Sequence, residues 1–205
     1  MSANGHVIHP IGVRLTHWLN AAAIAIMITS GWRIYNASPL FPFEFPAWMT
    51  LGGWLGGALA WHFAAMWLLA GNFAIYLGYG LVSGHIRRRL FPLRPSEIWR
   101  DAMLALRFRL PHDGSQYNAV QRLMYVGVGC CIALVIASGL AIRKPVQLYP
   151  LCFLLGGYEV ARRVHFLAMS GIAGFVVVHL ALVAIVPRTL LPMIVGRSSH
   201  ETGEA

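Results

Sequence analysis

The chain has 205 residues, of which 58% are hydrophobic and only 11% are charged. Ordinary soluble domains carry about 25% charged residues, and a chain this short has too little interior to hide so much apolar surface from water. With a mean hydropathy of +0.62, the composition excludes a soluble globular enzyme and a disordered tail and indicates an integral membrane protein. The formal net charge of +9 does not indicate nucleic-acid binding in a chain of this hydropathy.

Four apolar segments approach the length of about 20 residues that a helix needs to cross a bilayer. They cover Leu15–Trp32, Gly53–Ser83, Leu123–Ile142 and Val164–Pro187. Spanning segments in lipid must satisfy their own backbone hydrogen bonds, so all four are expected to be helices. The sequence therefore predicts an all-α fold, a transmembrane four-helix bundle, with residues 1–205 forming a single membrane domain.

The basic residues predict the orientation of these spans. The segment 84–122 carries eight Arg residues, whereas the loop between the first two spans holds only Arg33. Loops rich in Lys and Arg stay on the cytoplasmic side, so this segment and both termini are expected to be cytoplasmic. The N-terminus lacks the pattern of a cleavable signal peptide, and we expect it to be retained.

Two shorter segments are expected to lie near the membrane surface. Pro95–Leu110 has apolar residues interleaved with Arg, which predicts an amphipathic helix on anionic headgroups, with Ser96 as its cap. Val146–Gly157 is apolar but too short to span, and we expect an interfacial or re-entrant piece.

Four histidines fall inside the predicted spans, where ionisable residues are rare and usually functional. His17 begins the first span near the inner face, and His62 lies toward the outer face of the second. His165 and His179 lie toward the outer and inner ends of the fourth span, 14 residues apart. On a helix that spacing is about 21 Å and places both side chains on one face.

Each depth therefore holds two histidines from different helices: His17 with His179 on the inner side, and His62 with His165 on the outer side. Haem iron takes axial imidazoles from opposite sides, and bundle cores build such sites from facing helices. The pattern predicts two bis-histidine haems. A zinc site would need three or four ligands at one depth, and a proton relay would be expected to include carboxylates within the spans.

Small and basic residues around the histidines allow two interpretations each. Gly52, Gly53, Gly56 and Gly57 precede His62, and Ser170, Gly171 and Gly174 separate His165 from His179; they make room for a macrocycle or for close helix packing. Ser-Gly also recurs in ITSGWRI and IASGLAI at the outer ends of the first and third spans. Arg14, Arg162 and Arg163 either pair with haem propionates or are flanking interfacial charges.

The segment HPIGVRLTHWLNA, the four spans and the histidine positions resemble the bacterial di-haem cytochrome b group. That group includes cytochrome b561-type proteins and the cytochrome b subunits of Ni,Fe-hydrogenases and formate dehydrogenases. The resemblance covers nearly the whole chain and implies haem b on His17/His179 and on His62/His165.

The segment Tyr117–Arg122 resembles a motif of the formate dehydrogenase cytochrome subunit whose Asn and Gln line a quinone pocket. The resemblance implies that Asn118 and Gln121 contact a quinone, ubiquinone or menaquinone, near His179. The alternative interpretation is that Asn118 caps a helix and Gln121 is an interfacial side chain.

The residues around Lys144–Leu148, Gly156–Tyr158 and Ala161–Phe166 look most like cytochromes paired with periplasmic molybdopterin oxidoreductases. The resemblance therefore implies an electron-transfer subunit in the bacterial inner membrane, between such a partner and the quinone pool, with quinone reductase or quinol oxidase activity. Two alternatives stay open: a stand-alone superoxide oxidase, and a metal or proton transporter that uses intramembrane histidines.

Overall fold

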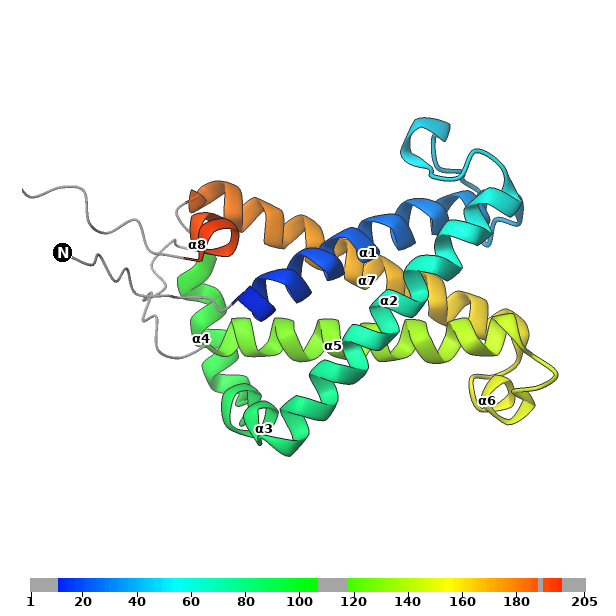
Figure 1. Cartoon of the computed structure of the whole chain (residues 1–205). Coiled ribbons are helices and arrows are strands. Elements are labelled where there is room, and N and C mark those ends of the chain that lie inside the picture. The colour runs from blue at the N-terminus through cyan, green and yellow to red at the C-terminus, as the bar shows by residue number, and fades with distance from the viewer. Residues whose placement is uncertain (1–10, 107–117, 188–189, 197–205) are drawn as a thin grey trace, which may run out of the picture. The chain divides into compact units, whose positions relative to one another are not determined.

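The computed structural model describes residues 11–106, 118–187 and 190–196. Its elements are helical throughout these ranges (Figure 1). In chain order they are α1 (Ile11–Ala37), the 3-10 helix η1 (Ala47–Met49), α2 (Leu55–Val82), α3 (His85–Leu90), α4 (Pro95–Leu106), α5 (Ala119–Arg143), α6 (Tyr149–Leu154), α7 (Tyr158–Ile185) and α8 (Leu190–Val195).

Helices α1, α2, α5 and α7 are long and apolar enough to cross a membrane, with hydropathies of 1.4, 1.4, 2.3 and 2.3 in their most apolar windows. They confirm the prediction of an all-helical protein with four spans. Each has 25 to 28 residues, and at a rise of about 1.5 Å per residue each is longer than the hydrocarbon layer is thick. Helix ends therefore extend beyond the apolar segments.

Helix α7 shows this extension most clearly. The expected span began at Val164, whereas the helix begins at Tyr158 and includes Arg162 and Arg163. Hydropathy detects the segment that lipid tolerates, but backbone hydrogen bonding decides where a helix ends, and charged residues are tolerated in a helix outside the hydrocarbon.

By its contacts the chain divides into two compact units, and each is described by itself. One unit comprises residues 1–72 and 176–205, and the other comprises residues 73–175. In the first unit, Asn72 of α2 donates a side-chain hydrogen bond to Asn20 of α1 (3.2 Å). The loop before α2 is held on α1 by a hydrogen bond from the Leu51 N–H to the Thr29 carbonyl (3.1 Å).

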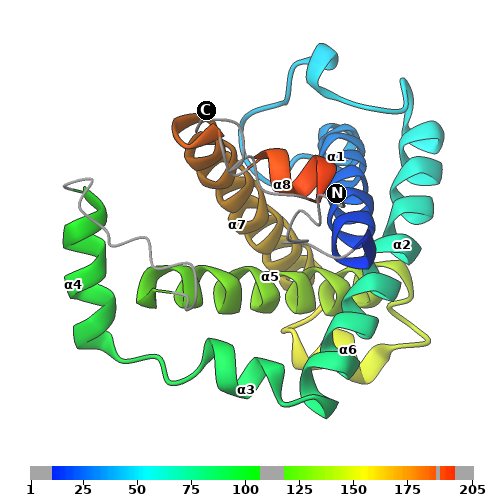
Figure 2. The same ribbon diagram turned by 60° about the vertical axis from the view of Figure 1, so that its left-hand side comes forward.

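The second unit is built around α5. Helices α3, α4 and α6 all pack against α5 (Figure 2). At one end, buried Cys152 of α6 packs with Ala141 of α5 and Ala161 of α7. Gly156 and Gly157 follow α6 with positive φ angles of 86° and 91°, a conformation that favours glycine and ends the helix. The predicted surface piece Val146–Gly157 therefore contains one short helix.

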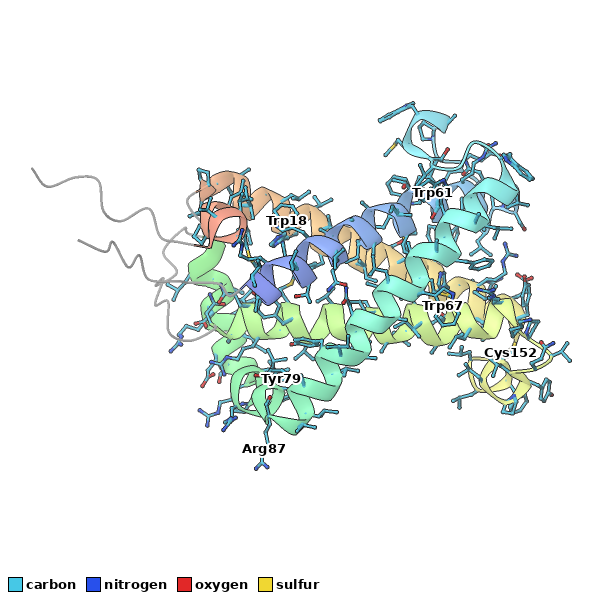
Figure 3. All side chains as sticks on the ribbon, viewed as in Figure 1. Trp18, Trp61, Trp67, Tyr79, Arg87 and Cys152 are labelled. Carbon is cyan, nitrogen blue, oxygen red and sulfur yellow. The ribbon has the colours of Figure 1, made fainter. Side chains whose placement is uncertain are left out.

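Most of the buried side chains in the spans are small, although Tyr35, Leu69 and Ile172 are buried as well. Ala23, Ala58 and Ala65 are buried in the first unit, and Val135, Ala161 and Ala168 in the second. Large apolar side chains are exposed instead, including Trp67, Tyr79 and Val177 (the first two labelled in Figure 3). Such a distribution fits helices that approach one another through small residues and present large ones to lipid.

The amphipathic helix starts one residue earlier than its expected cap. Helix α4 begins at Pro95, and its first backbone hydrogen bond runs from the Ile98 N–H to the Arg94 carbonyl (3.0 Å). The expected cap by Ser96 is therefore wrong, because proline is well suited to the first helical position and leaves serine inside the helix. The expected end, residues 107–110, lies outside the described residues.

A buried carboxylate joins α4 to α5. Asp101 is 7% exposed, and its Oδ2 accepts a hydrogen bond from the Ala119 N–H at the start of α5 (2.9 Å). Arg100 forms an ion pair with the other carboxylate oxygen (3.2 Å). A carboxylate at a helix N-terminus also interacts favourably with the helix dipole.

Asp101→Ala should lower the melting temperature of the protein in detergent, followed by circular dichroism. The substitution leaves the buried Ala119 N–H without its acceptor, which costs about 1–3 kcal/mol. Glu97→Ala is the matched control on the same helix, because it removes only an exposed ion pair with Arg94, worth about 1 kcal/mol or less. Equal shifts for the two variants would contradict a structural role for Asp101.

Candidate functional site

The four span histidines lie on three helices. His17 is on α1, His62 on α2, and His165 and His179 on α7. His17, His62 and His179 belong to the first unit and His165 to the second, so each imidazole is described with the neighbours in its own unit.

His17 and His179 approach each other inside the first unit. Their ring centroids are 6.2 Å apart and their planes make an angle of 61°. Two metal–imidazole bonds of about 2.0 Å, with each ring centre set back about 1 Å from its nitrogen, place ring centres about 6 Å apart across a metal. The spacing of these two rings therefore fits a pair of axial ligands to one iron.

His62 is held at its edge by the Ser-Gly pair of α1. The Ser30 hydroxyl oxygen lies 3.0 Å from His62 Nδ1. Gly31 lies close to the Cε1 edge of the ring, since a Cβ added there would be 3.4 Å from His62 Cε1. Ser30 itself is fully buried.

His165 has the same environment in the second unit. The Ser138 hydroxyl oxygen lies 3.0 Å from His165 Nδ1, and a Cβ on Gly139 would be 3.1 Å from His165 Cε1. The Ser-Gly repeat noted in the sequence thus contacts one span histidine in each unit.

Two separations along the helices are nearly equal. On α1, Ser30 follows His17 by 13 residues, and on α7, His179 follows His165 by 14 residues. These separations correspond to about 20 Å and about 21 Å along a helix.

The two donors that lie close together are His17 and His179. Across residues 11–106, 118–187 and 190–196, no three His, Cys, Asp or Glu side chains are placed to hold one metal ion. Two axial imidazoles suffice for haem, because the macrocycle supplies the other four nitrogens. The donor set therefore fits haem iron.

Asn118 and Gln121 form the N-terminal cap of α5. The Asn118 side-chain oxygen accepts from the Gln121 N–H (2.8 Å), and the Gln121 side-chain oxygen accepts from the Asn118 N–H (3.2 Å). This is a capping box, in which two backbone donors are satisfied reciprocally. Both oxygens are used by the cap, and the side-chain NH₂ groups are the donors that the two residues can offer a ligand.

Two of the three basic residues assigned to propionates, Arg14 and Arg162, have protein partners. Arg14 donates to the backbone carbonyls of Met193 and Ile194 at the end of α8, and Trp18 (labelled in Figure 3) donates to the Met193 carbonyl (3.2 Å). These bonds place cationic and N–H donors at a helix C-terminus, where they are favoured.

On α7, the Arg162 guanidinium lies 3.3 Å from the Glu159 carboxylate, whereas Arg163 is exposed. Assignment of these arginines and Arg14 to propionates stays a prediction.

The sequence reasoning missed Ser30 and Ser138 as functional residues. The signal was the repeated Ser-Gly dipeptide at the ends of two spans, which showed small residues but not their target. Gly31 and Gly139 were likewise recognised as small positions without an assigned histidine.

Comparisons with known proteins give a matching family and two relatives. A family described as prokaryotic cytochrome b561 matches residues 8–196. A relative from Azospira oryzae, named "Putative protein-methionine-sulfoxide reductase subunit YedZ1", is 53% identical over 96% of this chain and 100% of its own length. A second, from Bradyrhizobium diazoefficiens, named "Probable Ni/Fe-hydrogenase B-type cytochrome subunit", is 27% identical over 66% of this chain and 56% of its own length.

Proposed function

The chain belongs to the prokaryotic cytochrome b561 family, and from this premise we propose that it carries electrons between the quinone pool and a periplasmic redox partner. As a member it is a multi-pass cytochrome b of the bacterial inner membrane that binds haem b and acts as an electron-transfer subunit. This membership argues against the alternative of a metal or proton transporter. Haem b supplies the one-electron chemistry when bound, and the protein supplies ligands, orientation and electrostatics.

Two haems are proposed, one held by His17 and His179 and the other by His62 and His165. The observation that carries this proposal is the 6.2 Å separation of the His17 and His179 rings. The second site is supported by the same contact at both rings: Nδ1 of His62 and of His165 each lies 3.0 Å from the hydroxyl oxygen of a serine in a Ser-Gly pair. Ser30, which contacts His62, lies about 20 Å along α1 from His17, and His165 lies about 21 Å along α7 from His179. Since His17 and His179 are proposed to share one iron, these similar separations support placing His62 and His165 at one level.

The proposed partner is a periplasmic methionine-sulfoxide reductase, of the molybdopterin class that the sequence resemblance implies. The support is the relative that matches over its whole length and is named as a subunit of a protein-methionine-sulfoxide reductase. Quinol oxidation releases two electrons and two protons, and reduction of a sulfoxide to a thioether and water consumes two of each. Electrons would then run from quinol at the inner haem to the outer haem and the partner.

The proposed quinone site is the start of α5, next to the α4–α5 junction. Asn118 and Gln121 cap α5 through their oxygens, so their NH₂ groups are suitable donors to quinone carbonyls. The capping role and the proposed quinone role are therefore compatible.

The ligand pairs predict which substitutions act together. His62→Ala and His165→Ala should each remove the same haem, because the protein should not retain a haem at this site through only one of its two axial imidazoles. His17→Ala and His179→Ala should each remove the other one. The haem-to-protein ratio and a reduced-minus-oxidised spectrum measure the outcome, and removal of different haems by His62→Ala and His165→Ala would show the pairing to be wrong.

Asn118→Ser should slow reduction of the haems by quinol while both haems are retained. Serine is a good N-cap and accepts the hydrogen bond from the Gln121 N–H, but it lacks the amide NH₂ proposed to contact quinone. Stopped-flow reduction by a soluble quinol measures the rate. Asn118→Asp, which also caps α5, is a second variant without that donor, and wild-type rates in both variants would exclude Asn118 from the quinone site.

The direction and partner can be tested with the purified protein in liposomes. Quinol should reduce the haems, and a molybdopterin methionine-sulfoxide reductase added with sulfoxide outside the vesicles should reoxidise them. A hydrogenase added with hydrogen is the matched comparison and should leave haem reduction unchanged. Haem reduction by superoxide with no response to the reductase would instead favour the superoxide oxidase.

A further inference from the structure

We propose that Ser30 and Ser138 are positioning residues for the outer haem, each fixing the orientation and protonation of one axial histidine through its Nδ1 atom. The inference rests on the proposed function for the identity of the ligands, His62 and His165, and adds the residues that set their chemistry. It is carried by the same geometry at both sites.

The hydrogen on each serine hydroxyl is already assigned. Ser30 donates to the Ile26 carbonyl (2.5 Å), and Ser138 donates to the Leu134 carbonyl (2.5 Å), in both cases four residues earlier on the same helix. A hydroxyl has one hydrogen and two lone pairs. Each serine oxygen can therefore only accept from the imidazole 3.0 Å away.

It follows that Nδ1 carries the proton in both imidazoles. A neutral imidazole protonated on Nδ1 presents its lone pair on Nε2, the atom on the other side of the ring. Histidine metal ligands commonly donate their second N–H to an acceptor, which fixes the tautomer and ring orientation and makes the ligand more basic. The serines thus prepare His62 and His165 to bind iron through Nε2.

The glycine after each serine completes the support. Gly31 and Gly139 allow the Cε1 edges of His62 and His165 to lie against the helix backbone, at distances of 3.4 Å and 3.1 Å from where a Cβ would be. The Ser-Gly dipeptide thus provides a hydrogen-bond acceptor for one ring and lets the edge of that ring approach the helix backbone closely. The tighter fit at Gly139 makes that ring the more sensitive to an added methyl group.

The arrangement has a consequence for the reduction potential. An acceptor on Nδ1–H raises the electron density on the ligand and stabilises ferric iron relative to ferrous iron. Loss of either acceptor should therefore raise the midpoint potential. Because His62 and His165 are assigned to one iron, both serines should act on the same haem.

The test is a potentiometric titration, with electron paramagnetic resonance spectra, of Ser30→Ala and Ser138→Ala in the full-length protein. Each substitution should raise the midpoint potential of one haem, the same in both variants, and shift its low-spin signal. The other haem should keep its potential. The double variant should show the two shifts added together.

Matched controls come from hydroxyls that make the same backbone bond elsewhere. Thr29, next to Ser30, donates to the Ala25 carbonyl (2.8 Å), and Ser83, which follows α2, donates to the Tyr79 carbonyl (2.6 Å). Thr29→Ala and Ser83→Ala should leave both potentials unchanged. Shifts as large as those of the serine variants would overturn the proposal, because they would reflect loss of a hydroxyl from any helix.

Ser30→Thr and Ser138→Thr test the hydroxyl directly, since they retain the oxygen acceptor. Recovery of the wild-type potential and signal in the threonine variants supports the proposal, including where an alanine variant fails to retain its haem. Failure to recover in both threonine variants overturns it. Gly139→Ala should perturb the same haem signal more than Gly31→Ala, and the reverse order would count against ring support by the glycines.

The result is separable from a failure of the proposed electron transfer. A wild-type protein that binds haem but does not react with quinol or the reductase would contradict the proposed function and leave the potentials measurable. Alanine variants with wild-type potentials in a protein active with quinol would contradict the serine proposal alone.

Discussion

A polar ring inside a membrane span must find its hydrogen-bond partner within the protein or its cofactor, because hydrocarbon offers none. The environment of His62 and His165 follows from this constraint. At each ring one partner is a serine whose own hydrogen is satisfied by its helix, so the serine is an acceptor and the ring a donor. The Nδ1 side of each imidazole is thereby fixed, and this also fixes the direction in which Nε2 points.

The same constraint accounts for the small residues in the interior. A ring can reach a hydroxyl on a neighbouring helix only where the backbones come close, and close approach requires glycine, alanine or serine. Ala58 of α2 is buried in the first unit, and Ala141 and Ala161 are buried in the second. Large side chains such as Trp67 and Val177 are exposed on the helices. Small buried residues would indicate weak packing in a soluble protein. In these spans they allow the histidine-bearing helices to approach one another closely.

The four spans, and the placement of the four histidines on three of them, could be predicted from the sequence because both depend on local properties. Hydropathy identifies a span from its own residues, and the depth of a histidine follows from its position in that span. The extents were less accurate: α7 begins at Tyr158 rather than Val164, because the helix continues through charged residues. The Ser96 cap was wrong for a related reason, since Pro95 already takes the first helical position.

The roles of Ser30 and Ser138 could not be predicted from the sequence, although their repetition was visible. A hydroxyl on a helix contacts whatever the rotation and separation of the neighbouring helix bring to it, and those depend on packing along the whole length of both helices. The histidine spacing had a predictable geometry because two ligands lie on one helix. The serine contacts had none, because each joins two different helices whose relative rotation the sequence does not specify locally.

Residues at the ends of the spans show how one side chain serves structure and leaves room for function. Asn118 and Gln121 use their oxygens to cap α5, while Arg14 donates to the carbonyls at the end of α8. A helix end in the interfacial region has unsatisfied backbone groups that attract such side chains whether or not a ligand is nearby. For an acceptor ligand such as a quinone, the amides keep their NH₂ donors in addition to the cap. For an anionic propionate, Arg14 is in a similar position: a guanidinium has five N–H donors, and the α8 carbonyls accept from its Nε and Nη2 atoms. A propionate therefore does not have to displace these carbonyls. In both cases the contact that ends the helix and the proposed ligand contact use different atoms of one side chain, so the structural role is compatible with the proposed one.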